Sequence, residues 1–73
     1  MFAIIGYDKD GDIYEEYGYR NNASEAIEIA KNLTKKMLDG DLKTAEGEPI
    51  DWIAVYENWE NDEKKIWASY ENV

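Results

Sequence analysis

The chain of 73 residues contains no cysteine and no histidine, and it has a single proline and a single arginine. Without cysteine it can form no disulfide and offers no thiolate ligand to a metal. Without histidine it lacks the commonest general base and the commonest metal ligand. The longest apolar run, residues 1–5, is too short to span a bilayer or to form the core of a signal peptide. We therefore expect a cytoplasmic protein that folds as one domain over residues 1–73 and has no catalytic residues, metal or cofactor.

Acidic residues are abundant instead, with 17 Asp and Glu against 8 Lys and Arg and a formal net charge of −9. Residues 23–39 are neutral, with three acids and three lysines, so the net charge lies on the rest of the chain together with every aromatic residue. Excess acid argues against direct binding to nucleic acid or to an anionic membrane. It favours a basic protein partner or a cation, although acids that serve only solubility are the alternative.

Four segments have the composition of β-strands. Residues 1–8 and 51–58 are apolar on both alternating faces, which is typical of central strands. Residues 13–20 and 64–71 mix charged and aromatic side chains, which favours the edges of a sheet. The Asp10-Gly11 pair between the first two segments predicts a hairpin, because both residue types tolerate positive φ.

Residues 23–39 have the pattern of one amphipathic helix. Asn22 is placed to cap its start, with Glu25 at capping-box spacing, and Gly40 is placed to end it. The apolar stripe consists of Ala26, Ile27, Ala30, Leu33, Thr34 and Met37. Residues 40–50 follow as a long connection, and residues 60–63 are expected to form a polar turn.

These elements predict an α+β fold in β-β-α-β-β order: a four-stranded antiparallel sheet, strand order 2-1-3-4, with one helix packed on one face. Order 1-2-3-4 is the less favourable alternative, because it would bury the charged second strand. The aliphatic side chains are expected under the helix, namely Ile4, Ile53, Val55, Ile66 and Ala68. That leaves Tyr7, Trp52, Tyr56 and Trp67 for the open face, and the opposite assignment of faces is the alternative.

The predicted topology brings the first hairpin turn and the connection at 40–50 to one end of the sheet. This end would hold eight acids against Lys9 and Lys43, a concentration that steers cationic partners. We predict a partner-binding surface from most of these acids and the adjacent aromatic residues. Its members are Asp8, Asp10, Asp12, Asp41, Glu46, Glu48, Asp51, Tyr7, Tyr14, Trp52, Tyr56 and Trp67.

The spacing of Asp8, Asp10 and Asp12 matches the first, third and fifth positions of an EF-hand calcium loop. The glycine and glutamate required later in that loop are replaced by Ile13 and Tyr19. We therefore expect a structural turn, with weak cation binding as the alternative.

The short, cysteine-free and strongly acidic chain, with one helix on a small sheet, resembles small inhibitors encoded by phages and mobile elements, including anti-CRISPR and anti-restriction proteins. The resemblance lies in the general build and not in a motif. It implies a DNA mimic, whose carboxylates occupy the Arg/Lys groove of a nucleic-acid enzyme such as a host defence nuclease. One alternative is an accessory or structural module that forms a homodimer through the open aromatic sheet face. A second alternative is a sugar-binding protein.

Overall fold

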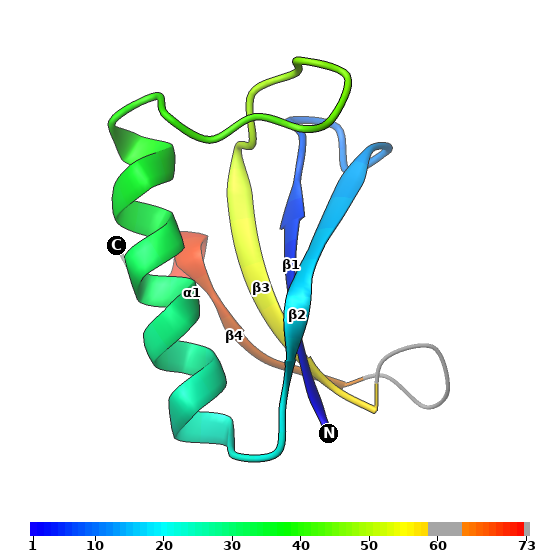
Figure 1. Cartoon of the computed structure of the whole chain (residues 1–73), viewed down its shortest axis with the longest axis vertical. Coiled ribbons are helices and arrows are strands. Elements are labelled where there is room, and N and C mark those ends of the chain that lie inside the picture. Colours follow the sequence, from blue (N-terminus) through cyan, green and yellow to red (C-terminus); the bar gives the residue numbers. More distant parts are fainter. Residues whose placement is uncertain (59–63, 73) are drawn as a thin grey trace.

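The computed structural model describes residues 1–58 and 64–72. Its elements are β1 (Phe2–Tyr7), β2 (Tyr14–Arg20), α1 (Ala23–Leu38), β3 (Trp52–Glu57), β4 (Lys64–Ala68) and the 3₁₀ helix η1 (Ser69–Glu71). The strands form one antiparallel sheet in the order β2-β1-β3-β4, and α1 lies across one face of it (Figure 1). The predicted α+β fold and strand order are therefore confirmed. The turn predicted at residues 60–63 lies outside the described residues.

Both ends of α1 form where the sequence predicts them. The Asn22 side-chain oxygen accepts hydrogen bonds from the backbone N–H groups of Ser24 at 2.9 Å and Glu25 at 3.2 Å. At the other end Gly40 adopts a φ of 79°, and its N–H donates to the carbonyl of Met37 at 3.0 Å. A left-handed residue stops the helix here, and the chain turns back over the end of the sheet.

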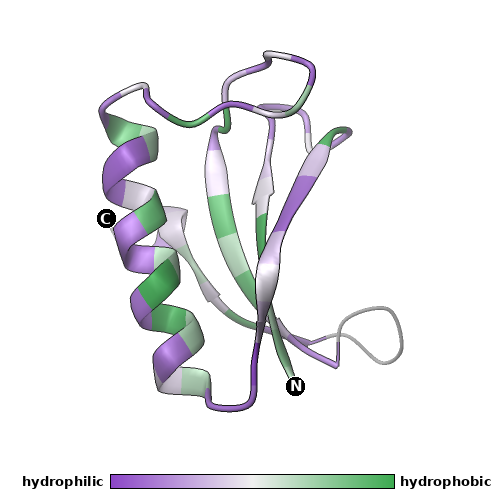
Figure 2. Cartoon of the chain, viewed as in Figure 1, coloured by the Kyte–Doolittle hydropathy of each residue, from purple (hydrophilic) through white to green (hydrophobic). Residues whose placement is uncertain are grey.

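The main core lies between α1 and the sheet. Ile4, Ile53 and Val55 are fully buried there, as predicted, against the small side chains Ala26 and Ala30 of α1. Alanines on the helix let its backbone approach the strands closely. Figure 2 shows hydrophilic residues gathered in the connections at both ends of the sheet and hydrophobic ones in the middle of β3.

A β-bulge in β4 changes which side chains reach this core. Val55 pairs with Trp67 but Tyr56 pairs with Lys65, so Ile66 is an extra residue on β4. Trp67 consequently packs with Ile66 on the helix side, and Ala68 lies on the open face. The predictions that Trp67 lies on the open face and Ala68 under the helix were wrong, because they assumed strict alternation, which a bulge breaks.

A second bulge lies in β2. Ile4 pairs with Gly18 but Ile5 pairs with Glu16, which leaves Tyr17 as the extra residue. The Tyr17 ring packs on the helix-side core and lies directly over Gly6. Its hydroxyl is buried and has no hydrogen-bond partner among the described residues. Burial raises the pKa of this phenol above its usual value, and the Glu15 carboxylate raises it further.

Replacement of tyrosine by phenylalanine is expected to change the free energy of unfolding in opposite directions at positions 17 and 7. Tyr17→Phe removes an unsatisfied polar atom and is expected to raise the free energy of unfolding by about 1 kcal/mol. Tyr7→Phe removes the hydroxyl that donates to Tyr56 at 2.9 Å and is expected to lower it by about 1 kcal/mol. Urea denaturation of both variants beside the wild type measures the difference. Equal signs would contradict the assignment of the Tyr17 hydroxyl as unsatisfied.

The raised pKa of Tyr17 adds a pH dependence to the same comparison. The folded state holds the phenol proton more tightly than the unfolded chain, whose tyrosines titrate near pH 10. The contribution of the protonated Tyr17 to the free energy of unfolding is therefore complete below about pH 10 and is lost as the pH rises further. Alkaline unfolding should be less steep in Tyr17→Phe than in the wild type.

The sequence predicted a fourth strand that extends to Glu71, but β4 ends at Ala68. The Ser69 hydroxyl accepts a hydrogen bond from the backbone N–H of Ile53 at 3.0 Å, and the chain turns into η1. This turn brings the Tyr70 ring edge-on to Trp52, with 5.5 Å between the ring centroids. Tyr70 therefore joins the open face of the sheet.

Candidate partner-binding surface

The sheet face opposite α1 is covered by its own aromatic side chains. Tyr7 and Trp52, paired across β1 and β3, stack with their ring centroids 4.0 Å apart and their planes 14° apart. The Tyr7 hydroxyl extends to the hydroxyl of Tyr56 on the same face. Ile5 and Ala54 are fully buried on this face. The rings thus form a second, smaller core on the side that no predicted element was expected to cover.

Three tyrosines form an exposed rim around this second core. Tyr14, Tyr19 and Tyr70 are 49%, 40% and 57% exposed. Of these, only Tyr14 was among the site residues predicted from the sequence. Tyr19 was missed because the bulge at Tyr17 moves it to the open face, opposite Ala3. Tyr70 was missed because it follows the end of β4, where strand alternation gives no signal.

The rim already binds one cation of the chain itself. The Lys65 ammonium donates a hydrogen bond to the Tyr70 hydroxyl and lies 4.8 Å from the centroid of that ring. It also lies 3.9 Å from a carboxylate oxygen of Glu71. The hydrogen bond to Tyr70 raises the pKa of Lys65. An aromatic ring beside a carboxylate is an arrangement that accommodates a positive side chain.

The β1–β2 turn and the connection between α1 and β3 meet at one end of the sheet, as predicted (Figure 1). The Asp51 N–H donates to the carbonyl of Tyr7 at 2.7 Å and joins the two segments. A cleft of about 360 Å³ opens between them, lined by Asp8, Lys9, Asp10, Glu48, Pro49 and Asp51. We call this region the acidic cleft.

Asp8 lines the acidic cleft, but its carboxylate also stabilises the β1–β2 turn. One of its carboxylate oxygens accepts hydrogen bonds from the N–H groups of Asp12 at 2.9 Å and Ile13 at 3.2 Å. In residues 1–58 and 64–72 no group of three or more carboxylates is placed to hold a metal ion. The hydrogen bonds of Asp8 agree with the predicted structural turn at Asp8, Asp10 and Asp12.

The long connection is a compact, hydrogen-bonded loop. The Thr44 hydroxyl oxygen is buried and accepts hydrogen bonds from the N–H groups of Glu46 at 3.3 Å and Glu48 at 3.1 Å. The Glu15 carboxylate of β2 accepts a hydrogen bond from the N–H of Ala45 at 2.6 Å and ties the loop to the sheet. Glu46 and Glu48 are thus presented to solvent on a fixed backbone.

The carboxylates of the acidic cleft are not neutralised by neighbouring lysines. Within the described part of the chain, the one ion pair closer than 4 Å joins Lys65 and Glu71, away from the cleft. Lys35 and Lys36 in the last turn of α1 lie at the same end of the molecule but on the helix side. These two lysines lie beside Asp39 and Asp41, whose N–H groups donate to the carbonyls of Lys35 and Lys36, so they do not neutralise the acidic cleft.

The other predicted site residues do not all belong to one surface. Asp12 is exposed in the β1–β2 turn, and Tyr7, Trp52 and Tyr56 lie on the open face, as predicted. Asp41 is exposed at the C-terminal end of α1, where its N–H donates to the carbonyl of Lys36 at 2.9 Å, and it does not line the acidic cleft. Trp67 does not belong to this surface, because it is buried on the helix side.

Comparisons with protein-family models, with curated proteins and with solved structures found no match to this chain. No helix in residues 1–58 and 64–72 is long and apolar enough to cross a membrane. A function must therefore be argued from the geometry of the acidic cleft and the aromatic rim.

Proposed function

We propose that the protein binds a basic surface of another protein through the acidic cleft and the adjoining aromatic rim. The observation that carries the proposal is their continuity. Asp8 follows Tyr7 and Asp51 precedes Trp52, so the stacked pair of rings begins where the acidic cleft ends. Tyr14 and Tyr70 of the rim lie against this pair, with ring centroids 6.2 Å from Tyr7 and 5.5 Å from Trp52. Carboxylates at the cleft would steer a cationic partner, and the rings would supply contact area that a partner can bury.

The partner that we propose is a nucleic-acid-binding enzyme, such as a host defence nuclease. A groove built from Arg and Lys to hold phosphates also attracts arrayed carboxylates, so the protein would act as a DNA mimic. In this proposal it is a cytoplasmic inhibitor of the phage or mobile-element type, comparable in role to anti-CRISPR proteins. We propose a role without catalysis. The net charge of −9 repels phosphate, so the protein itself would not bind nucleic acid.

A second candidate function is an accessory module that forms a homodimer through the open sheet face. The exposure of Tyr14, Tyr19 and Tyr70 on one face favours it. The two candidates respond oppositely to salt. The affinity of an apolar contact between two sheets stays the same or increases as the salt concentration rises, whereas the affinity of a contact made by carboxylates decreases. Light scattering after size-exclusion chromatography at two salt concentrations would detect such a dimer.

The charge-reversal variant Glu48→Lys/Asp51→Lys tests the proposed function. Both side chains are exposed and line the acidic cleft, so we expect the fold to persist and partner affinity to fall by at least about tenfold. The matched control is Glu25→Lys/Glu28→Lys on α1, where both residues are also exposed. Each double variant changes the net charge from −9 to −5, so a difference between them reports position and not total charge.

The measurement is capture of a nucleic-acid-binding enzyme on the immobilised protein, followed by competition. Duplex DNA should release the captured enzyme, and so should an increase in salt from about 50 to about 200 mM. Failure of DNA to compete would contradict DNA mimicry. Equal loss of binding in the control variant would show that position in the acidic cleft is irrelevant.

A further inference from the structure

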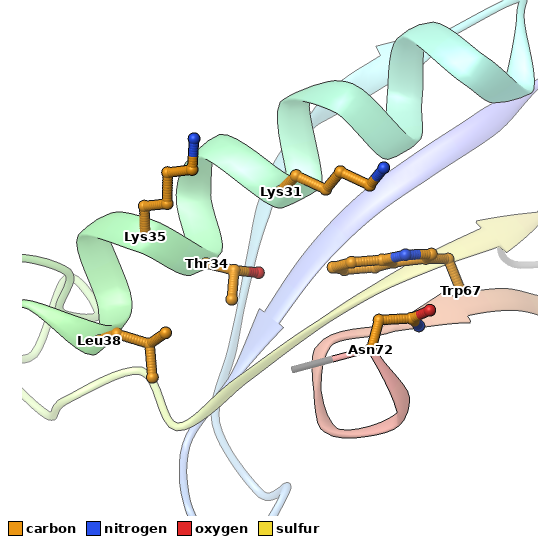
Figure 3. Close-up of a pocket in the computed structure, with 6 residues that line it drawn as sticks. All are labelled: Lys31, Thr34, Lys35, Leu38, Trp67 and Asn72. Carbon is orange, nitrogen blue, oxygen red and sulfur yellow. The ribbon is translucent and has the colours of Figure 1, made fainter.

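A second concavity lies on the other side of the molecule, between the C-terminal half of α1 and the segment formed by β4 and η1 (Figure 3). It has a volume of about 260 Å³ and is lined by Lys31, Thr34, Lys35, Leu38, Trp67 and Asn72. The four helix residues follow the spacing i, i+3, i+4 and i+7, so they form one continuous stripe along α1. We call this concavity the helix-edge groove.

The walls of the helix-edge groove are apolar. The Thr34 hydroxyl donates to the carbonyl of Ala30 at 2.8 Å, and the Asn72 amide donates to the carbonyl of Ala68 at 2.7 Å. Each of these polar side chains therefore donates a hydrogen bond within the protein. The indole of Trp67 and the side chain of Leu38 provide the apolar surface, and Leu38 is 63% exposed. An exposed leucine beside a tryptophan leaves apolar surface that a ligand could cover.

Among the described residues, the charged side chains that line the helix-edge groove have one sign. Lys31 and Lys35 belong to its lining, and no Asp or Glu does. Among residues 1–58 and 64–72, no carboxylate oxygen lies within 4 Å of either ammonium group. In Figure 3 Lys31 extends towards Trp67, whereas Lys35 points away from the floor of the groove. The lining of the acidic cleft has four carboxylates and one lysine, so the two concavities differ in the sign of their charge.

We propose that the helix-edge groove binds a small organic acid with a compact aryl or alkyl body and one carboxylate. The body would lie against Trp67 and Leu38, and the carboxylate would accept hydrogen bonds from Lys31, with Lys35 contributing its charge. The volume is below the roughly 300 Å³ at which pockets for larger ligands begin, which excludes a dinucleotide-sized cofactor. A neutral ligand would leave both ammonium groups unused, and a cation would be repelled.

Nuclear magnetic resonance titration of the 15N-labelled chain with 4-phenylbutyrate tests this proposal. A ligand this small should bind with a dissociation constant on the order of 1 mM. We expect saturable shifts of the Trp67 indole N–H, while the Trp52 indole on the opposite sheet face stays unchanged. The neutral amide, 4-phenylbutyramide, has the same shape and should bind at least about tenfold more weakly, because it lacks the charge.

Matched variants locate the binding. Lys31→Met should remove most of the preference for the carboxylate over the amide. Lys36→Met removes the same charge from an exposed position of α1 outside the groove and should leave the preference intact. Leu38→Asp should abolish binding, and because Leu38 is exposed the fold should persist, which the dispersion of the amide spectrum verifies.

Several results would overturn the proposal. They are equal affinity for acid and amide, unchanged Trp67 shifts at saturating concentration, and equal effects of Lys31→Met and Lys36→Met. Because the helix-edge groove and the acidic cleft share no residue, none of these results bears on the proposed function.

Discussion

Trp67→Ala is expected to lower the free energy of unfolding by about 3–5 kcal/mol. Trp67 is only 8% exposed and belongs to the same buried cluster as Ile4 and Val55. Truncation to alanine removes most of the apolar area of the side chain and leaves a cavity between α1 and β4. Small domains have about 5–15 kcal/mol of stability in total, so the variant should melt far below the wild type or fail to fold at room temperature. Thermal and urea denaturation followed by circular dichroism measure the loss.

Trp52→Ala is the control for Trp67→Ala, because it truncates a tryptophan outside the main core. Trp52 is half-buried on the open face, where it stacks on Tyr7, and its truncation should cost clearly less than that of Trp67. Trp67→Phe keeps an aromatic ring in the core and should retain most of the stability. If Trp67→Ala were no more destabilising than Trp52→Ala, the placement of Trp67 under the helix would be wrong. Strict strand alternation, which puts both tryptophans on the open face, predicts such equality.

Gly6→Val is expected to lower the free energy of unfolding by about 3 kcal/mol, near the upper end of overpacking penalties. A Cβ atom at Gly6 would lie 2.7 Å from Cε2 of Tyr17, 3.1 Å from Cγ2 of Ile50 and 3.2 Å from Cδ1 of Ile53. Gly6 has no positive φ, so the requirement for glycine comes from the close approach of Tyr17 and not from the backbone. Urea denaturation measures the loss.

A double-mutant cycle with Tyr17→Ala separates this explanation from a general intolerance of valine. Removal of the ring vacates the space that the valine needs, so Gly6→Val should cost at least about 1 kcal/mol less in the Tyr17→Ala background. Additive effects of the two substitutions would show that the Tyr17 ring is not the reason why position 6 requires glycine.

The strand order was predictable because charge and apolarity are segregated among the strands. β1 and β3 are apolar on both faces and lie in the centre, whereas the charged β2 and β4 lie at the edges. The limits of α1 followed from Asn22 and Gly40, residues whose local chemistry decides the conformation without help from distant parts of the chain.

The two bulges were not predictable in the same way. A one-residue shift moves every following side chain to the other face of a sheet, so one bulge in β4 exchanged the positions of Trp67 and Ala68. Gly18 beside the bulge in β2 is a recognisable signal, because glycine inside a strand often marks a bulge. Nothing in the local sequence around Ile66 gives such a signal, and the register there depends on tertiary packing.

The sequence predicted where the candidate site lies but not which of its carboxylates are available for binding. Topology alone brings the β1–β2 turn and the connection at 40–50 together. Which carboxylates remain available depends on hydrogen bonds between distant residues. Asp8 is engaged by the turn and Glu15 by the N–H of Ala45, and neither engagement can be read from spacing. Tyr70 reached the surface only because Ser69 turned the chain.

The bulges also decide how the sheet ends. Each lies on one of the two outer strands, at Tyr17 in β2 and at Ile66 in β4. A bulge breaks the even spacing of backbone donors and acceptors that an incoming strand would need for pairing. Neither border therefore offers a regular template for strand addition, and the short, charged outer strands discourage the pairing of a further strand as well.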